Sequence, residues 1–211
     1  MDKITSWHDI SITKYKKLID IVKDDETTEQ EKDVAIIALV NNMTEEEVLD
    51  TYIADIAKLK QNILFLNEFP KPEDKKYKTF TINGKEYDVV VDMNAFTYAQ
   101  YVDFQNYWTE DNNIGKVLST ILVPKGGKYG VGYDIAEFIQ EIEDSVSIAD
   151  GKSLCFFLLK SLQTLIKNSL KYLEKIAKGK KALTMSKEKQ MEIAMELQKI
   201  KEMQSYLGYI S

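Results

Sequence analysis

An Asn-Gly dipeptide at positions 83 and 84 is the sequence feature that most constrains the fold. Two segments of alternating polar and apolar residues flank it, "YKTFTI" before and "KEYDVVV" after. A two-residue type I′ turn requires a positive φ at both central residues, and Asn-Gly adopts this conformation readily. The sequence therefore predicts a β-hairpin over about residues 77–91. Because two strands alone are only marginally stable in water, we expect the hairpin to pack on helices.

Helical spacing of apolar residues dominates the rest of the chain. Thr28 and Glu31 have the spacing of a capping box, and so do Thr44 and Glu47, which indicates two helix starts. Pro70 ends the helical pattern that follows Thr44. The predicted helical segments are about 10–22, 28–40, 44–69, 94–108, 113–123, 134–143 and 148–177.

The predicted fold class is therefore mainly α, with two parts. Residues 1–179 form a helical domain that carries the β-hairpin. Composition changes near residue 180, where "KGKKALTMS" combines a glycine with a cluster of lysines. Residues 180–211 are predicted to form a basic junction and a C-terminal amphipathic helix.

Composition excludes several classes of protein. All 28 basic residues are lysines, and the net charge at pH 7 is -6. Arginine is the side chain that reads guanine and phosphate through paired hydrogen bonds, so its absence in an acidic chain argues against a nucleic-acid partner. The longest strongly apolar run, residues 154–159, is far shorter than the roughly twenty residues that span a bilayer. We expect a cytosolic or particle-bound protein with no membrane partner.

Few residues offer catalytic or metal-binding chemistry. His8 is the single histidine, and it is interpreted as a member of a surface or capping pair with Asp9. Cys155 is the single cysteine, so no intramolecular disulfide can form, and its apolar neighbours favour a buried position. "DGKS" at 150–153 resembles the end of a phosphate-binding loop, but Val146 stands where that loop requires glycine. The segment is predicted to be the first turn of a helix.

Two further groups were weighed for function. Glu141, Glu143 and Asp144 lie close together, and they are predicted to form the solvated face of a helix because acid–base catalysis needs buried carboxylates with separated pKa values. "GGKYGVG" at 126–132 matches no dinucleotide-binding pattern, which leaves a chain reversal or a binding loop. The sequence predicts no catalytic, cofactor-binding or metal-binding residue, no cofactor, and a protein that is not an enzyme.

An aromatic segment, "TYAQYVDFQNYW" at 97–108, offers a candidate docking face. On a helix, Tyr101, Phe104 and Trp108 share one side, with Tyr98 one turn earlier. Aromatic stripes with this spacing usually bury themselves in a core, and the alternative is a contact with a partner protein. Tyr101 and Trp108 are candidate partner-binding residues.

The amphipathic pattern of the last helix offers a second candidate. Its apolar stripe must be buried either on the body of the protein or on a partner, and methionines allow such a face to adapt to varied apolar surfaces. The candidate contact residues are Met191, Met195, Ile200, Met203 and Leu207.

Several segments resemble tail assembly chaperones of tailed bacteriophages. They include "ISITKYKKLIDI", "YKTFTINGKEYDVVVDMNAFTYAQYVDFQNYW", "ILVPKGGKYGVGYDIAEFIQEI" and "LCFFLLKSLQTLIKNSLKYLEK". The similarity extends over about residues 8–178. It includes a helix like that at 97–105 and a later helix like that at 153–159, and it rests on pattern and order rather than on a catalytic signature.

This resemblance implies a non-enzymatic role in virion assembly. Such chaperones hold the tape measure protein, a long apolar helical chain, soluble in the host cytoplasm until tail-tube subunits polymerise around it. The implied partners are the tape measure protein and, less directly, tail-tube subunits, with self-association left open. The alternative is a structural protein retained in the virion, at the capsid–tail junction or as packaged cargo.

Overall fold

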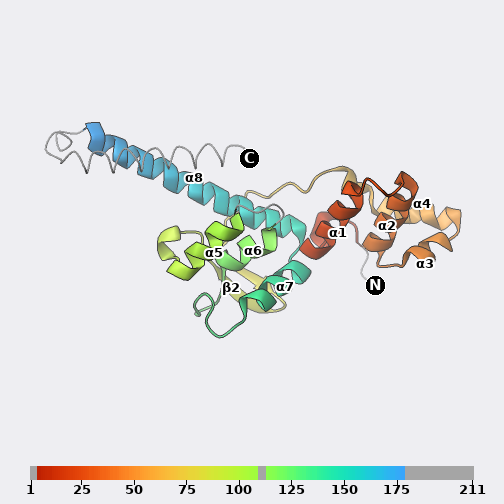
Figure 1. The fold of residues 1–211 in the computed structure, drawn as a ribbon, viewed down its shortest axis with the longest axis horizontal. Coiled ribbons are helices and arrows are strands. Elements are labelled where there is room, and N and C mark those ends of the chain that lie inside the picture. Colours follow the sequence, from red (N-terminus) through yellow and green to blue (C-terminus); the bar gives the residue numbers. More distant parts are fainter. Residues whose placement is uncertain (1–3, 109–112, 179–211) are drawn as a thin grey trace. The chain divides into compact units, whose positions relative to one another are not determined.

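The computed structural model describes residues 4–108 and 113–178 (Figure 1). These residues form eight α-helices, three short 3-10 helices and one three-stranded antiparallel sheet, which confirms the predicted mainly α class. The α-helices are α1 (Ile12–Lys23), α2 (Glu29–Asn41), α3 (Glu45–Leu49), α4 (Ile53–Asn62), α5 (Tyr98–Trp108), α6 (Ile114–Ile121), α7 (Ile135–Ser145) and α8 (Ile148–Lys178).

The chain divides into two compact units, Met1–Phe156 and Phe157–Ser211. In the second unit the structure describes the rest of α8, where the hydroxyls of Ser161 and Thr164 donate to carbonyls one turn earlier. The predicted helix over 148–177 is confirmed as α8. The predicted boundary near residue 180 and the predicted C-terminal helix lie outside the described residues.

The predicted β-hairpin is confirmed, and it gains a third strand. Strands β1 (Thr79–Ile82) and β2 (Lys85–Val89) pair antiparallel around Asn83 and Gly84, whose φ angles are 49° and 76°. Strand β3 (Leu122–Pro124) pairs with the other edge of β2. The helix predicted over 113–123 therefore ends too late, because a residue that precedes proline disfavours the α conformation and β2 offers it ladder hydrogen bonds instead.

The long helix predicted over 44–69 is divided into three pieces. Helix α3 ends at Leu49, α4 begins at Ile53, and a 3-10 turn, η2 (Leu64–Asn67), follows. At the first break the Thr51 hydroxyl donates to the Glu47 carbonyl at 2.6 Å, and Tyr52 is extended. Short polar side chains compete with the helical ladder in this way. The capping boxes predicted at Thr28 and Thr44 are both present.

Helix α6 and the strand that follows it form the centre of the first unit. Every residue from Val117 to Val123 is buried. Helix α6 packs against α5 and α7, and Figure 1 shows these elements grouped around the sheet. A separate apolar cluster lies under α2, where Ile37, Ala38 and Val48 are buried.

The start of the chain is fixed to the α7–α8 junction by a short antiparallel bridge. The Ile12 amide donates to the Val146 carbonyl at 3.1 Å, and the Ile148 amide donates to the Ile10 carbonyl at 2.8 Å. All four of these apolar side chains are buried. This bridge brings the residues before α1 beside the first turn of α8.

Candidate functional site

The structure describes two of the seven predicted partner-binding residues, both on α5. Tyr101 is half-buried, and its hydroxyl accepts a hydrogen bond from the Gln105 amide at 2.6 Å. Trp108 is also half-buried and lies against Phe104, with ring centroids 5.3 Å apart. Phe104 is buried, so this face of α5 is partly core and partly surface. The five candidates of the C-terminal helix, from Met191 to Leu207, lie outside the described residues.

Polar residues interleaved with these rings have structural partners. The buried Gln100 amide donates to the Thr120 carbonyl at 2.5 Å. That carbonyl belongs to the last turn of α6, and the residue four positions later is Pro124, which has no N–H to offer. Asp103 accepts a hydrogen bond from the Tyr129 hydroxyl at 2.8 Å. The polar positions of the aromatic segment therefore connect α5 to α6 and to the segment 126–132, which we call the glycine-rich loop.

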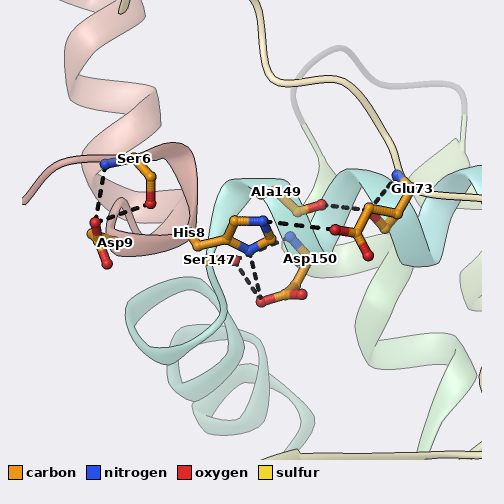
Figure 2. Close-up of polar contacts among 8 residues, drawn as sticks. Ser6, His8, Asp9, Glu73, Ser147, Ala149 and Asp150 are labelled. Carbon is orange, nitrogen blue, oxygen red and sulfur yellow. Dashed lines mark hydrogen bonds and ion pairs between the residues drawn. The ribbon is translucent and has the colours of Figure 1, made fainter. Parts of the chain in front are cut away.

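His8 lies in a cluster of polar side chains (Figure 2). Its ring nitrogens are 3.9 Å from a Glu73 carboxylate oxygen and 3.8 Å from an Asp150 carboxylate oxygen. These residues come from the 3-10 turn η1 (Trp7–Asp9), the connector before β1, and the first turn of α8. Asp9 forms a capping box with Ser6, whereas the partners of His8 are Glu73 and Asp150.

Ser147 and Ser153 of this cluster form hydrogen bonds with groups other than His8. The Ser147 hydroxyl donates to Asp150 at 2.7 Å (Figure 2). The Ser153 hydroxyl donates to the Ala149 carbonyl at 2.8 Å and accepts from the Glu73 amide. A serine nucleophile requires a hydrogen bond to its general base. The arrangement instead holds the connector beside the start of α8, with ion pairs that form when the His8 ring is protonated.

One of the three carboxylates predicted to lie on a solvated helix face is in fact packed. The Glu143 side chain is 12% exposed, and it accepts a hydrogen bond from the Lys16 ammonium at 2.6 Å. A β-carbon placed on Gly115 of α6 would lie 2.3 Å from the Glu143 side chain. The prediction was wrong for Glu143 because α1 and α6 cover that side of α7.

Cys155 is half-buried rather than fully buried as expected, and its apolar surroundings determine the chemistry of its thiol. Desolvation raises the pKa of its thiol to about 12, so the thiol stays protonated at neutral pH. A protonated thiol is a poor nucleophile and a poor metal ligand. This agrees with the expected role of a small apolar residue in α8.

The largest apolar exposure in the described residues lies at the break between α3 and α4. Leu49 is 70% exposed, Tyr52 is 83% exposed and Ile53 is 89% exposed. We call these three residues the α3–α4 apolar patch. Sequence reasoning missed it because a continuous helix would place Leu49 and Ile53 on one inward face. The signal that was available is the Asp50-Thr51 pair, which interrupts the helix.

Acidic residues flank the α3–α4 apolar patch in the sequence. Glu45, Glu46 and Asp50 are exposed, and Asp55 in the first turn of α4 forms an ion pair with Lys58 at 2.7 Å. The patch therefore combines exposed apolar side chains with negative charge. Such a surface complements an apolar partner that carries basic residues.

In residues 4–108 and 113–178 no three His, Cys, Asp or Glu side chains are grouped as a metal site, and no helix has the length and hydropathy to cross a bilayer. Neither models of known protein families, nor curated proteins, nor solved structures match this chain.

Proposed function

We propose that this protein is a tail assembly chaperone of a tailed bacteriophage. In this role it binds apolar helical segments of the tape measure protein and keeps them soluble until tail-tube subunits polymerise around them. The proposal rests on the resemblance of residues 8–178 to this family and on one structural observation, the α3–α4 apolar patch.

The patch supports the proposal because exposed apolar side chains are unfavourable unless a partner covers them. Burial of one large apolar side chain contributes about 1.5–3 kcal/mol. Leu49, Tyr52 and Ile53 are all more than two-thirds exposed within a stretch of five residues. Large exposed apolar side chains this close together in the sequence favour an interaction site.

The charge around the patch supports a particular kind of partner helix. The carboxylates of Glu46, Asp50 and Asp55 lie next to the apolar side chains in the sequence. They favour an amphipathic helix whose apolar face is bordered by lysines, and they disfavour an acidic one. Since acidic groups at the edge of a contact act mainly on association rate, the complex forms quickly and stays weak enough to release.

A chaperone that only binds its partner and is then displaced by stronger contacts needs no nucleotide hydrolysis. A small apolar contact protects the partner from aggregation while it is unassembled, and the larger contacts of the tail tube then displace it. Stronger contacts with the tube drive release by mass action. The protein is thus a binding protein that leaves the completed structure.

Mass spectrometry of purified mature particles and of the infected-cell lysate tests this proposal. We expect the protein to be abundant in the lysate and absent from the particles. Stoichiometric presence in particles would overturn the chaperone role and favour the structural virion protein.

Co-expression with the tape measure protein then tests the binding surface. We expect the wild-type chain to keep the tape measure protein soluble and to co-purify with it. A variant with Tyr52→Ser and Ile53→Ser should fold normally and lose this activity. Val22→Ser, which alters another exposed apolar side chain on α1, is the matched control and should behave as wild type. If the double variant keeps the tape measure protein soluble as well as Val22→Ser does, the patch is excluded as the contact.

A further inference from the structure

A cleft of about 610 Å³ lies beneath the glycine-rich loop of the first unit. Three elements form it: strand β2, helix α7, and the segment 124–134 that connects β3 to α7. It is separate in sequence from the α3–α4 apolar patch.

Glycines and two anchored tyrosines determine the shape of the loop. Gly126, Gly130 and Gly132 have φ angles of 71°, 68° and 82°, which side-chain-bearing residues rarely adopt. The Tyr129 side chain is buried and donates to Asp103 of α5. Desolvation, followed by the hydrogen bond to Asp103, raises the pKa of Tyr129 well above its usual range, so this donor stays protonated.

The second tyrosine that anchors the loop is Tyr133, which lines the cleft. Its hydroxyl accepts a hydrogen bond from the Gly130 amide at 3.1 Å, and its ring meets the Phe138 ring edge-on at 5.3 Å. Between the two anchors, Val131 is 66% exposed. The loop therefore holds one apolar side chain at the border of the cleft and one aromatic ring inside it.

Aromatic rings form one wall of the cleft. The rings of Tyr87 and Phe138 are stacked, with centroids 5.1 Å apart and planes inclined by 19°. Tyr87 and Phe138 are themselves buried, and the half-buried Tyr133 ring extends this apolar wall. Such a wall suits an aliphatic chain.

The charges around the cleft are unequal in number. Two lysines and four carboxylates line it. Lys125 pairs with Glu86 at 2.7 Å, and Lys85 pairs with Glu141 at 3.5 Å. Asp134 caps α7 by accepting from two backbone amides. Among the described residues, Glu137 has no ion-pair partner, and it stands in the first turn of α7 beside Phe138.

We propose that this cleft binds a lysine side chain that projects from a segment of a partner protein. The aliphatic stem lies along Val131 and the Tyr133–Phe138 pair, and the ammonium reaches the Glu137 carboxylate. The stem is matched by the apolar wall, and the charge is matched by the unpaired carboxylate. A volume of about 610 Å³ exceeds one side chain, so residues on either side of the lysine also contact the cleft.

An anionic or purely apolar occupant fits less well. An anion would meet an excess of carboxylates, and an apolar group would bury Glu137 without a partner, which is unfavourable. The lysine satisfies both the wall and the carboxylate. The contact is partly open to water, so we expect millimolar affinity for a single short segment, as for other exposed ion pairs.

Three matched pentapeptides test the proposal by NMR titration of the full-length, ¹⁵N-labelled protein. The probes are acetyl-Ala-Ala-Lys-Ala-Ala-amide, the same peptide with norleucine in place of lysine, and the same peptide with glutamate. We expect the lysine peptide to cause saturable shifts at Val131, Gly132 and Glu137. The norleucine peptide should bind about fivefold more weakly, because it keeps the stem and lacks the charge. The glutamate peptide should cause no saturable shift.

Two variants separate the two parts of the contact. Glu137→Gln should weaken the lysine peptide to the level of the norleucine peptide and leave the norleucine peptide unchanged. Val131→Ser should weaken both peptides by the same factor. Glu46→Gln, an exposed carboxylate on α3, is the control and should change neither. Val131 and Glu137 are both exposed, so their variants keep the fold.

Three results would overturn the proposal. The first is the absence of saturable shifts around the cleft with the lysine peptide. The second is equal affinity for the lysine and norleucine peptides. The third is a Glu137→Gln variant that binds the lysine peptide as the wild type does.

Discussion

Residues 117–123 and residues 48–53 are both rich in large apolar side chains, yet the structure buries the first segment and exposes much of the second. The buried segment lies between α5, α7 and strand β2, so its side chains contact other elements on several sides. The exposed segment lies at a break between two short helices, and only Val48 points into the small cluster under α2. Apolar composition therefore predicts burial only where the chain also supplies neighbours.

The largest expected contrast between the two segments comes from matched truncations. Leu118→Ala removes a fully buried side chain from α6 and should lower the free energy of unfolding by about 2–5 kcal/mol. Ile53→Ala in the exposed segment should change it by no more than about 0.5 kcal/mol. Urea unfolding followed by circular dichroism measures both values. Equal losses would show that the exposed segment is covered in solution.

A smaller effect is expected from Gln100, the polar side chain that is hydrogen-bonded to the buried segment. Gln100→Ala removes the donor that satisfies the Thr120 carbonyl and should lower the free energy of unfolding by about 1–3 kcal/mol. Gln105→Ala, on the exposed side of the same helix, is the control and should cost little. A loss at position 100 no larger than at position 105 would mean that water reaches the Thr120 carbonyl.

Acid should weaken α2, which packs against α3 of the exposed segment, through its N-terminal capping box. The Thr28 hydroxyl, and then the Thr28 amide, hold the pKa of Glu31 below its ordinary value of 4.5. A lowered pKa contributes stability that is present above 4.5 and is lost as the pH falls through the folded-state value. Glu31→Ala should therefore be less stable than wild type at pH 7, and the difference should shrink below pH 4.5 in urea unfolding. The loss caused by Leu118→Ala should remain at low pH.

The smallest stability effect is expected at the centre of the exposed segment. Tyr52→Ser should leave the free energy of unfolding within about 0.5 kcal/mol of wild type, because the ring is 83% exposed. Thermal unfolding measures this effect. A marked loss would mean that the ring packs against this same chain in solution, which would also weaken its assignment to a partner.

The sequence was sufficient for the elements whose signals are local. The Asn83-Gly84 turn, the capping boxes at Thr28 and Thr44, and the long helix from Ile148 were all predicted, because each depends on residues a few positions apart. Strand β3 was missed, since it forms only where β2 offers an edge. The burial of Glu143 was missed for the same reason, because Lys16 and Gly115 are distant in sequence.

The candidate sites were also hard to predict because they depend on the three-dimensional arrangement of the chain rather than on local signals. The exposed apolar patch depends on a helix break that a periodic pattern conceals, and the cleft beneath the glycine-rich loop depends on strand, loop and helix meeting in space. The sequence indicated that the glycine-rich loop could bind a partner. It did not indicate the aromatic side chains or the Glu137 carboxylate that a ligand in the cleft would contact. Tyr101 and Trp108 remain candidates, since half-buried rings are compatible with either a core or a contact.

The bridge between the start of the chain and the α7–α8 junction has a consequence during protein synthesis. The Thr13 hydroxyl and Asp144, which lie beside this bridge, are 131 positions apart in sequence. A nascent chain therefore cannot complete the packing of α1 until most of the first unit has left the ribosome, and such distant contacts form slowly. Helices α2 and α3 begin at local capping boxes and can form earlier, so this part of the unit is in place before the rest has closed.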